Sequence, residues 1–411
     1  MREPFFVPTS QPVPSQREVT LRCIQCGRVW PVASLLFGCP TCAATLEVRY
    51  PARDAAVLRD AKRTGSIWDF KALLPVGAQA PMISLGEGWT PLIPARTLGA
   101  NTLVKYEAVN PTTSFKDRLN AVSVSMAVQL GYERVLCTST GNHGVSLAAY
   151  AAAAGLECLV VCSPGIEPLA VRQIRQHGGR AIRVEAPATA TRAWLATLIQ
   201  RDGWWPSVRN HPRPFANPFG LEGYKTIAYE IWAQMDGRIP DWVLVPTGGG
   251  DSLAGIARGF RELYELGLAT RRPRLVACQP NAAAPLVQAV RRGDTHVAPI
   301  QVSTSIAVSI AEDHTGDHAL HALDEHDRAV AVSEQSIRTA VQQLAASGMC
   351  VDPASAASVA ALSVLRESGD IGANEWAVCI ATSSGLRWSA AFDVSDDGQP
   401  ELVRATPDGV I

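Results

Sequence analysis

The sequence predicts an α/β protein whose mostly parallel sheet is covered by helices on both faces. From about residue 82 onward, short apolar runs rich in β-branched residues alternate with longer amphipathic stretches. Runs of this length and continuous apolar character indicate buried parallel strands. The expected strands are 102–104, 134–137, 158–162, 242–245, 275–278 and 376–380, and the clearest helices between them are 117–130, 145–154 and 252–266.

The composition is that of an ordinary globular protein with a large core. Of the 411 residues, 47% are hydrophobic and 18% are charged. The formal net charge of -1 provides no general attraction to nucleic acid or to an anionic membrane. We therefore expect neither as a partner, and an anionic small-molecule substrate must be held by locally placed groups.

No segment has the pattern of an export signal or a membrane span. The first residues include Glu3 and Pro4 where a signal would be apolar, and the longest apolar stretch, 147–162, is interrupted by Gly155 and Glu157. That stretch predicts a helix followed by a buried strand. Six of the ten cysteines lie mostly in apolar runs, as buried free thiols do. We therefore expect a reducing, cytoplasmic environment.

The chain divides into four segments by composition. Residues 1–20 are proline-rich and polar and predict a loose tail, 21–50 contain clustered cysteines, 51–80 form a linker arm with several charges, and 81–411 form the α/β core.

The cysteine segment has the spacing of a zinc ribbon. Two C-x-x-C pairs are separated by 12 residues, with Gly27 and Pro40 shaping the turns. Four thiolates leave no open coordination position, so the zinc is expected to be structural. The alternative is a ribbon that has lost its metal. The four candidate ligands are Cys23, Cys26, Cys39 and Cys42.

Lys116 is the candidate nucleophile. The chain has only five lysines, and this one opens the helix predicted over 117–130. The positive end of a helix lowers the pKa of an ammonium and favours anions. A lysine in that position can be a free amine and form a Schiff base with an aldehyde cofactor. The alternative is an ordinary surface lysine, which spacing alone does not exclude.

Three further loops follow predicted strands, where parallel-sheet proteins bind ligands. Residues 138–144 concentrate hydroxyls, an amide and glycines that can hold an anion or carboxylate; a histidine such as His143 more often packs than catalyses. Residues 246–252 contain Gly248, Gly249 and Gly250, whose amides can approach a phosphate at a helix start. The alternative for this loop is a tight turn. In the last loop, the Thr382 hydroxyl can bond a neutral heterocyclic nitrogen.

Taken together, these motifs resemble the threonine synthase branch of the fold type II pyridoxal-phosphate enzymes. The resemblance covers roughly residues 23–388 and follows one order along the chain. Its pieces are the cysteine pairs, Leu85-Gly86-Glu87-Gly88-Trp89-Thr90-Pro91-Leu92, Asn110-Pro111-Thr112, Ser114-Phe115-Lys116-Asp117-Arg118, Ser139-Thr140-Gly141-Asn142, Asn217-Pro218, Leu221-Glu222-Gly223, the glycine loop and Pro353-Ala354-Ser355-Ala356-Ala357-Ser358.

The resemblance implies two lobes with pyridoxal 5'-phosphate between them. The small lobe would span about 109–215 and the large lobe 81–108 and 216–390. Lys116 would be the Schiff-base lysine and proton shuttle, Asn142 would lie beside the cofactor's phenolic oxygen, and Thr382 would face the pyridine nitrogen. Thr247, Gly248, Gly249, Gly250 and Asp251 would surround the cofactor phosphate, and Ser139, Thr140, Gly141 and His143 would bind the substrate. The resemblance also implies a homodimer.

The resemblance implies chemistry on an amino acid and leaves its substrate open. A threonine synthase would convert O-phosphohomoserine and water to threonine and phosphate. A related ammonia-lyase or β-replacement enzyme would act on serine, threonine or a specialised amino acid. A binding protein without activity is the third hypothesis, against which the intact Lys116 and Asn142 argue.

Four departures from the synthase pattern bear on that choice. They are Thr113 in place of a glycine, His143 after Asn142, Gly220 where an arginine is common, and Asp352 in place of a glutamate. A missing guanidinium weakens the hold on an anionic leaving group by about 1.5–3 kcal/mol. Arg213 or Lys225 is the expected compensating cation.

Overall fold

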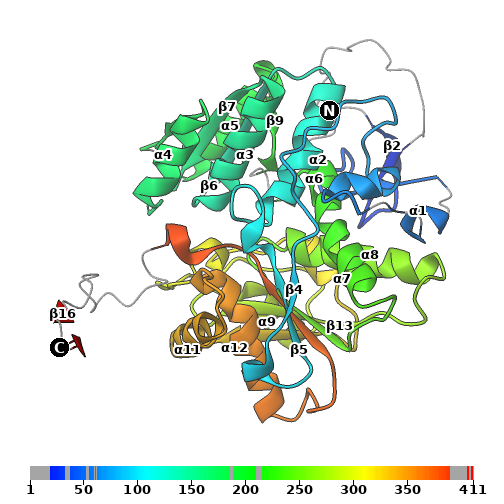
Figure 1. Ribbon diagram of the computed structural model, residues 1–411. Coiled ribbons are helices and arrows are strands. Elements are labelled where there is room, and N and C mark those ends of the chain that lie inside the picture. The colour runs from blue at the N-terminus through cyan, green and yellow to red at the C-terminus, as the bar shows by residue number, and fades with distance from the viewer. Residues whose placement is uncertain are drawn as a thin grey trace.

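The computed structural model describes residues 19–32, 38–51, 55–59, 61, 63–163, 165–185, 188–209, 215–388, 405–406 and 409–410. The tail expected over residues 1–20 lies outside these residues as far as residue 18. Two sheets dominate the molecule, one in the upper and one in the lower half of Figure 1.

The larger sheet has six strands in the order β14-β13-β12-β15-β5-β4. All neighbouring pairs are parallel except β4 with β5 at the edge. The strands are β4 (Leu92–Pro94), β5 (Thr102–Tyr106), β12 (Trp242–Pro246), β13 (Arg274–Pro280), β14 (Arg328–Val332) and β15 (Ala377–Ala381).

Helices cover both faces of this sheet. Val243 and Val245 of β12 pack into one core cluster, whereas the alternate residues Trp242 and Leu244 pack into another. The first cluster includes residues of α7 (Lys225–Gln234), α8 (Asp251–Glu265), α9 (Pro285–Arg292) and α10 (Asp317–Leu320), and the second those of α11 (Glu334–Ala346) and α12 (Pro353–Glu367). Side chains that alternate between two apolar cores explain the continuously hydrophobic strand sequences.

The smaller sheet has four parallel strands in the order β8-β7-β6-β9. They are β6 (Arg134–Ser139), β7 (Glu157–Cys162), β8 (Arg180–Ile182) and β9 (Trp205–Pro206). The helices of this part are α2 (Lys116–Gln129), α3 (Asn142–Ala154), α4 (Pro168–Gln176) and α5 (Ala188–Arg201). The stretch 147–162 is therefore the end of a helix and a buried strand, as expected, and no described helix is long and apolar enough to cross a membrane.

The cysteine segment forms a three-stranded antiparallel sheet in the order β2-β1-β3. Its strands are β1 (Thr20–Cys23), β2 (Val29–Pro31) and β3 (Leu46–Arg49). Leu21, Leu46 and Val48 belong to the same core cluster as the smaller sheet. The arm that follows is also packed, because Ile67, Phe70 and Leu73 are at most 1% exposed.

Short elements connect these parts. They are α1 (Ala56–Arg59), η1 (Ile67–Leu73), η2 (Arg96–Leu98), η3 (Glu107–Val109), β10 (Val208–Arg209), β11 (Phe215–Ala216), α6 (Pro218–Leu221), η4 (Glu222–Tyr224), η5 (Val308–Ile310), η6 (Gly385–Arg387), β16 (Ala405–Thr406) and β17 (Gly409–Val410).

Candidate active site

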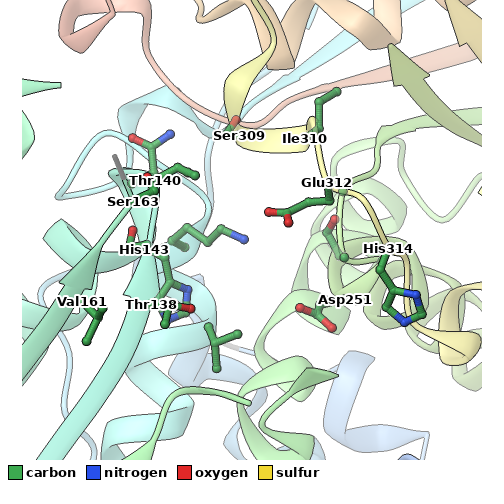
Figure 2. Close-up of a pocket in the computed structure, with 18 of the residues that line it drawn as sticks. Thr138, Thr140, His143, Val161, Ser163, Asp251, Ser309, Ile310, Glu312 and His314 are labelled. Carbon is green, nitrogen blue, oxygen red and sulfur yellow. The ribbon is translucent and has the colours of Figure 1, made fainter. Parts of the chain in front are cut away.

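A cavity of about 550 Å³ lies at the carboxyl ends of strands from both sheets. It is lined by the loops that follow β6, β7, β12 and β15 and by residues 309–314. Figure 2 shows Thr138, Thr140 and His143 on one side, with Asp251, Glu312 and His314 on the other. Ligands of open parallel sheets bind at this edge.

Lys116 lines the cavity as the first residue of α2. Its Nζ lies 4.7 Å from the ring centroid of Phe115 and 5.7 Å from that of Tyr224. Burial lowers the pKa of the Lys116 ammonium, and the carboxylates of Asp251 and Glu312 act in the opposite direction. The amine is thus brought closer to its reactive, uncharged form.

Buried polar contacts fix the start of α2. The Asp117 carboxylate accepts hydrogen bonds from the backbone N–H of Thr112 at 2.7 Å and from its hydroxyl at 2.5 Å. The next residue, Arg118, is fully buried and donates to Glu107 at 2.7 Å and to Glu230 at 2.5 Å. A buried ion pair that loses one partner is destabilised strongly, so this network holds the backbone on which Lys116 sits.

Ser139 shapes the loop after β6. Its hydroxyl oxygen accepts hydrogen bonds from the amides of Gly141 at 2.9 Å and Gly144 at 2.8 Å. Because the oxygen accepts twice, the hydroxyl proton is left for a ligand. Ser139, Thr140 and Asn142 line the cavity, whereas Gly141, at a φ of 150°, makes the turn and is not among the lining residues.

His143 lines the cavity, and its ring is held by a hydrogen bond to Ser207. Its Nε2 lies 3.0 Å from the Ser207 hydroxyl, which itself donates to Asn120 at 2.6 Å. Since that hydroxyl donates its proton to Asn120, Nε2 is the donor to Ser207. Burial lowers the pKa of His143 to about 3, with Lys116 adding to the effect. His143 is therefore a neutral imidazole at physiological pH.

The glycine loop presents backbone amides to the cavity. The Gly248 carbonyl accepts from the Thr315 hydroxyl at 2.7 Å and the Gly249 carbonyl from the Gly316 amide at 3.0 Å. In a trans peptide the N–H points opposite to the carbonyl, so the amides of Gly249 and Gly250 are directed away from residues 315–316. A Cβ built on Gly249 would meet only Asp251 within 4 Å, at 3.9 Å.

This loop fits a phosphate. Among the described residues, the amides of Gly249 and Gly250 donate to no protein acceptor, and they adjoin the N-terminus of α8, where the helix dipole favours an anion. The adjacent Asp251 carboxylate is paired with His318 at 2.8 Å. Thr247 is fully buried and is not among the lining residues. Its hydroxyl donates to the Val245 carbonyl at 2.8 Å.

The loop after β15 holds a chain of hydroxyls. Thr382 lies 2.9 Å from the Ser355 hydroxyl, and the neighbouring Ser383 donates to Asp352 at 2.6 Å. Asp352 also accepts from the amide of Ser355 at 2.8 Å and so caps the start of α12. Thr382 lines the cavity, and its hydroxyl oxygen is held in place by Ser355.

Two parts of the candidate site were not predicted from the sequence. Ser309, Glu312 and His314 line the cavity from a segment that follows no strand, so the rule that places ligand loops after strands could not find them. Arg387, buried behind the Thr382 loop, contacts Asn142. Its signal was available, since it is the only charged residue between Trp376 and Phe392.

The expected compensation by Lys225 is wrong. Lys225 is fully buried away from the cavity, where its Nζ lies 2.6 Å from Glu222 and 3.1 Å from Glu262 and donates to the Leu73 carbonyl at 2.8 Å. A cation committed to these partners cannot receive a substrate anion. The other expected cation, Arg213, lies outside the described residues.

The four cysteines near the N-terminus converge as their spacing predicted. The sulfurs of Cys23, Cys26, Cys39 and Cys42 all lie within 4.8 Å of one another. The closest pairs are Cys23 with Cys42 at 3.4 Å and Cys26 with Cys39 at 3.6 Å. A tetrahedral metal with sulfur at about 2.3 Å brings its ligands to this kind of separation, so the cluster can hold a metal ion.

An α/β fold with a cavity lysine, an amide cradle and a hydroxyl facing the same space defines a class of enzymes that use a phosphorylated aldehyde cofactor. Residues 83–383 match the family model of the pyridoxal-phosphate dependent enzymes. The chain belongs to that family.

Similar proteins place the chain more narrowly. It is 33% identical to the threonine synthase of Methanosarcina acetivorans, over 95% of this chain and 97% of that protein. It is 35% identical to the threonine synthase of Methanocaldococcus jannaschii, over 89% of this chain and 92% of that protein. Solved structures similar in fold include maize serine racemase (TM-score 0.64, 19% identity, 84% of this chain and 95% of that one) and a fungal L-serine ammonia-lyase from Rhizomucor miehei (TM-score 0.62, 21% identity, 74% and 96%).

Proposed function

We propose that the chain is a threonine synthase, which converts O-phosphohomoserine and water to threonine and phosphate. The observation that carries this proposal is the 33% identity to a threonine synthase over 95% of the chain, with the cysteine segment included. The cavity is lined by Lys116, by the hydroxyls of Ser139 and Thr140 and by the glycine loop, an arrangement that supports the same chemistry.

The described residues fit pyridoxal 5'-phosphate. Lys116 would hold its aldehyde carbon, the amides of Gly249 and Gly250 its phosphate, Thr382 its ring nitrogen and Asn142 its phenolic oxygen. When bound, the cofactor supplies an electron sink for the bond broken at the amino acid's Cα.

The protein's own contribution is positioning and proton transfer. Lys116 Nζ is the base that can take a proton from the substrate and later return it, because burial keeps its pKa low. The hydroxyls of Ser139 and Thr140 would hold the substrate carboxylate, and Thr140 lies on the wall opposite Glu312. The neutral His143 would donate no second proton, since its Nε2–H is given to Ser207.

A second candidate is an ammonia-lyase or β-replacement enzyme acting on serine, threonine or a specialised amino acid. One observation favours it: the described cavity lining contains Asp251, Glu312 and Asp313 but no arginine. Carboxylates repel a phosphate monoester and do not repel a leaving hydroxyl.

A substrate panel tests the two candidates. The cofactor-loaded protein is given O-phosphohomoserine, threonine and serine, and both inorganic phosphate and keto acid are measured. We expect phosphate and threonine from O-phosphohomoserine, and the Lys116→Ala variant gives the background. Keto acid from serine or threonine, with no phosphate released, would establish the second candidate.

We further propose a structural zinc in the cysteine segment, a homodimer and a cytoplasmic location. The closed set of four thiolates supports the zinc. We also propose that the small lobe spans about 109–215 and the large lobe 81–108 and 216–390, a division supported by the four-stranded and six-stranded sheets.

A further inference from the structure

Arg387 joins the loop before Lys116 to the loop that carries Asn142. It is 6% exposed and belongs to η6. One terminal nitrogen donates to the Asn142 side-chain oxygen at 2.5 Å, and the other donates to the Thr112 carbonyl at 2.9 Å and the Thr113 hydroxyl at 3.0 Å. One guanidinium thus connects two segments that are 29 residues or more apart in sequence and both contribute to the cavity.

The guanidinium has no carboxylate partner at ion-pair distance among the described residues. The carboxylates that act on Arg387 from a greater distance are those of Asp117 at the start of α2 and Asp352 at the cap of α12. In addition, Nε of Arg387 is buried without a hydrogen-bond acceptor. A buried cation without a counter-ion is costly, and a packing role alone would be filled at lower cost by an apolar side chain.

Thr113 supplies a second, independent observation. Its φ of 60° is in the left-handed region, which is a genuine outlier for a β-branched residue. The strained turn is held from both sides, because Ser384 N–H donates to the Thr113 carbonyl at 3.0 Å while Arg387 binds its hydroxyl. Three residues later the chain reaches Lys116. Backbone strain of this kind persists where the surrounding structure fixes it.

Arg387 and Ser383 together fix which way the Asn142 amide points. A guanidinium only donates, so the atom of Asn142 that faces it must be the oxygen. The amide nitrogen is therefore on the opposite side, where one N–H donates to Ser383 at 3.0 Å. Among the described residues the other N–H has no acceptor, and Asn142 lines the cavity.

We propose that Arg387 is a positioning residue for the reaction: it fixes the Asn142 amide toward the bound cofactor and clamps the strained turn that leads to Lys116. This inference rests on membership of the pyridoxal-phosphate family and on the residues above, and it is independent of the substrate. The amide N–H of Asn142 that Arg387 helps to hold would stabilise a negatively charged phenolic oxygen on the bound cofactor, and its loss would favour protonation there.

The test compares Arg387→Met, which removes charge and fork, with Arg387→Lys, which keeps the charge. The cofactor-loaded proteins are titrated with pH while the visible absorption band is followed. We expect the apparent pKa of that band to rise by about one unit in Arg387→Met and to change little in Arg387→Lys. In both, kcat should fall about 10- to 100-fold with a smaller change in KM. Arg96→Met, at an exposed site, is the control and should match the native protein.

The spectral arm needs no substrate, so it decides the matter even if the proposed threonine synthase activity fails. A native band titration in a folded Arg387→Met protein would by itself overturn the proposal. Should Arg387→Met not fold, Arg387→Lys decides: a native kcat in a folded protein overturns the positioning role, and a reduced kcat at native thermal stability supports it. Thr113→Gly removes the strain and the hydroxyl contact together, and it should fold at least as stably as the native protein.

Discussion

The Tyr50 hydroxyl donates a hydrogen bond to the Glu222 carboxylate at 2.5 Å and so ties the cysteine segment to the α/β core. The same carboxylate lies 2.6 Å from Lys225 and 3.0 Å from Arg258. The next residue, Gly223, packs directly on the backbone of Arg118, which a Cβ at Gly223 would overlap. The cysteine segment is therefore connected to the helix that carries Lys116 through the adjacent residues Glu222 and Gly223.

Replacing Tyr50 by phenylalanine should destabilise the protein by about 1–3 kcal/mol. The ring stays, but the buried carboxylate loses one donor. The measurement is chemical unfolding followed by fluorescence. Tyr264→Phe removes the same atom from an exposed tyrosine of α8 and should change nothing. Equal stability of the two variants would show that Lys225 and Arg258 satisfy Glu222 without Tyr50.

Replacing Cys26 by serine should release the metal from the cysteine segment. Elemental analysis of the native protein should find about one zinc per chain, because four thiolates complete one tetrahedral site. The variant should lose it and become sensitive to protease between β1 and β3, since such small segments gain most of their order from the metal. Cys350→Ser, at a half-buried cysteine outside the cluster, should keep the zinc. Native protein that contains no zinc after purification under reducing conditions would contradict the proposal.

Two alanine substitutions in the glycine loop should behave differently. At Gly250, with a φ of 100°, a Cβ would lie 2.4 Å from that of Ala319, so Gly250→Ala should cost about 1–3 kcal/mol of stability. At Gly249 the space is open on the protein side, so Gly249→Ala should fold normally. Its added Cβ would enter the cavity beside the amides, where the phosphate is expected, and should weaken the binding of pyridoxal phosphate about tenfold. Thermal unfolding and cofactor titration measure the two effects. Native cofactor affinity in Gly249→Ala would place the phosphate elsewhere.

The sequence was sufficient for those parts of the site that follow a strand, and insufficient for those that depend on distant packing. A buried strand can be recognised in the sequence as an apolar run, and the loop that follows it must lie at the edge of the sheet. This made it possible to predict Lys116, Asn142 and the glycines of residues 248–250. For Arg387 the sequence shows a lone charge in an apolar stretch, but its contact with Thr112, 275 residues earlier, is encoded by no local pattern. The two shortest strands of the smaller sheet, β8 and β9, have only 3 and 2 residues, too few for a periodic signal.

Lys225 illustrates the opposite error. It lies two residues after Leu221-Glu222-Gly223 and was expected to compensate for the missing arginine, yet its side chain lies in a buried cluster with Glu222 and Glu262. The sequence shows that a residue is charged, but it does not show whether neighbouring helices and strands bury that residue. The same limit applies to Thr113, whose left-handed backbone becomes intelligible only beside Arg387.

The stability of the protein should carry a pH dependence that comes from His143. Its folded pKa is about 3, whereas an unfolded histidine titrates near about 6.5. Between these values the unfolded chain binds a proton that the folded protein refuses, so the contribution is fully present above about pH 6.5 and is lost as the pH falls toward 3. Asp117 acts with the opposite sign, because burial raises its folded pKa to about 6 and the folded protein takes up the proton first.

The contribution of His143 can be separated by comparing the native protein with His143→Gln, since Asp117 is common to both. The difference in unfolding free energy between the two should fall by about 2 kcal/mol from pH 7 to pH 5, as measured by urea unfolding at each pH. If the His143→Gln difference is constant instead, the imidazole is protonated with its Ser207 contact intact, and the neutral histidine assigned to the cavity wall is wrong.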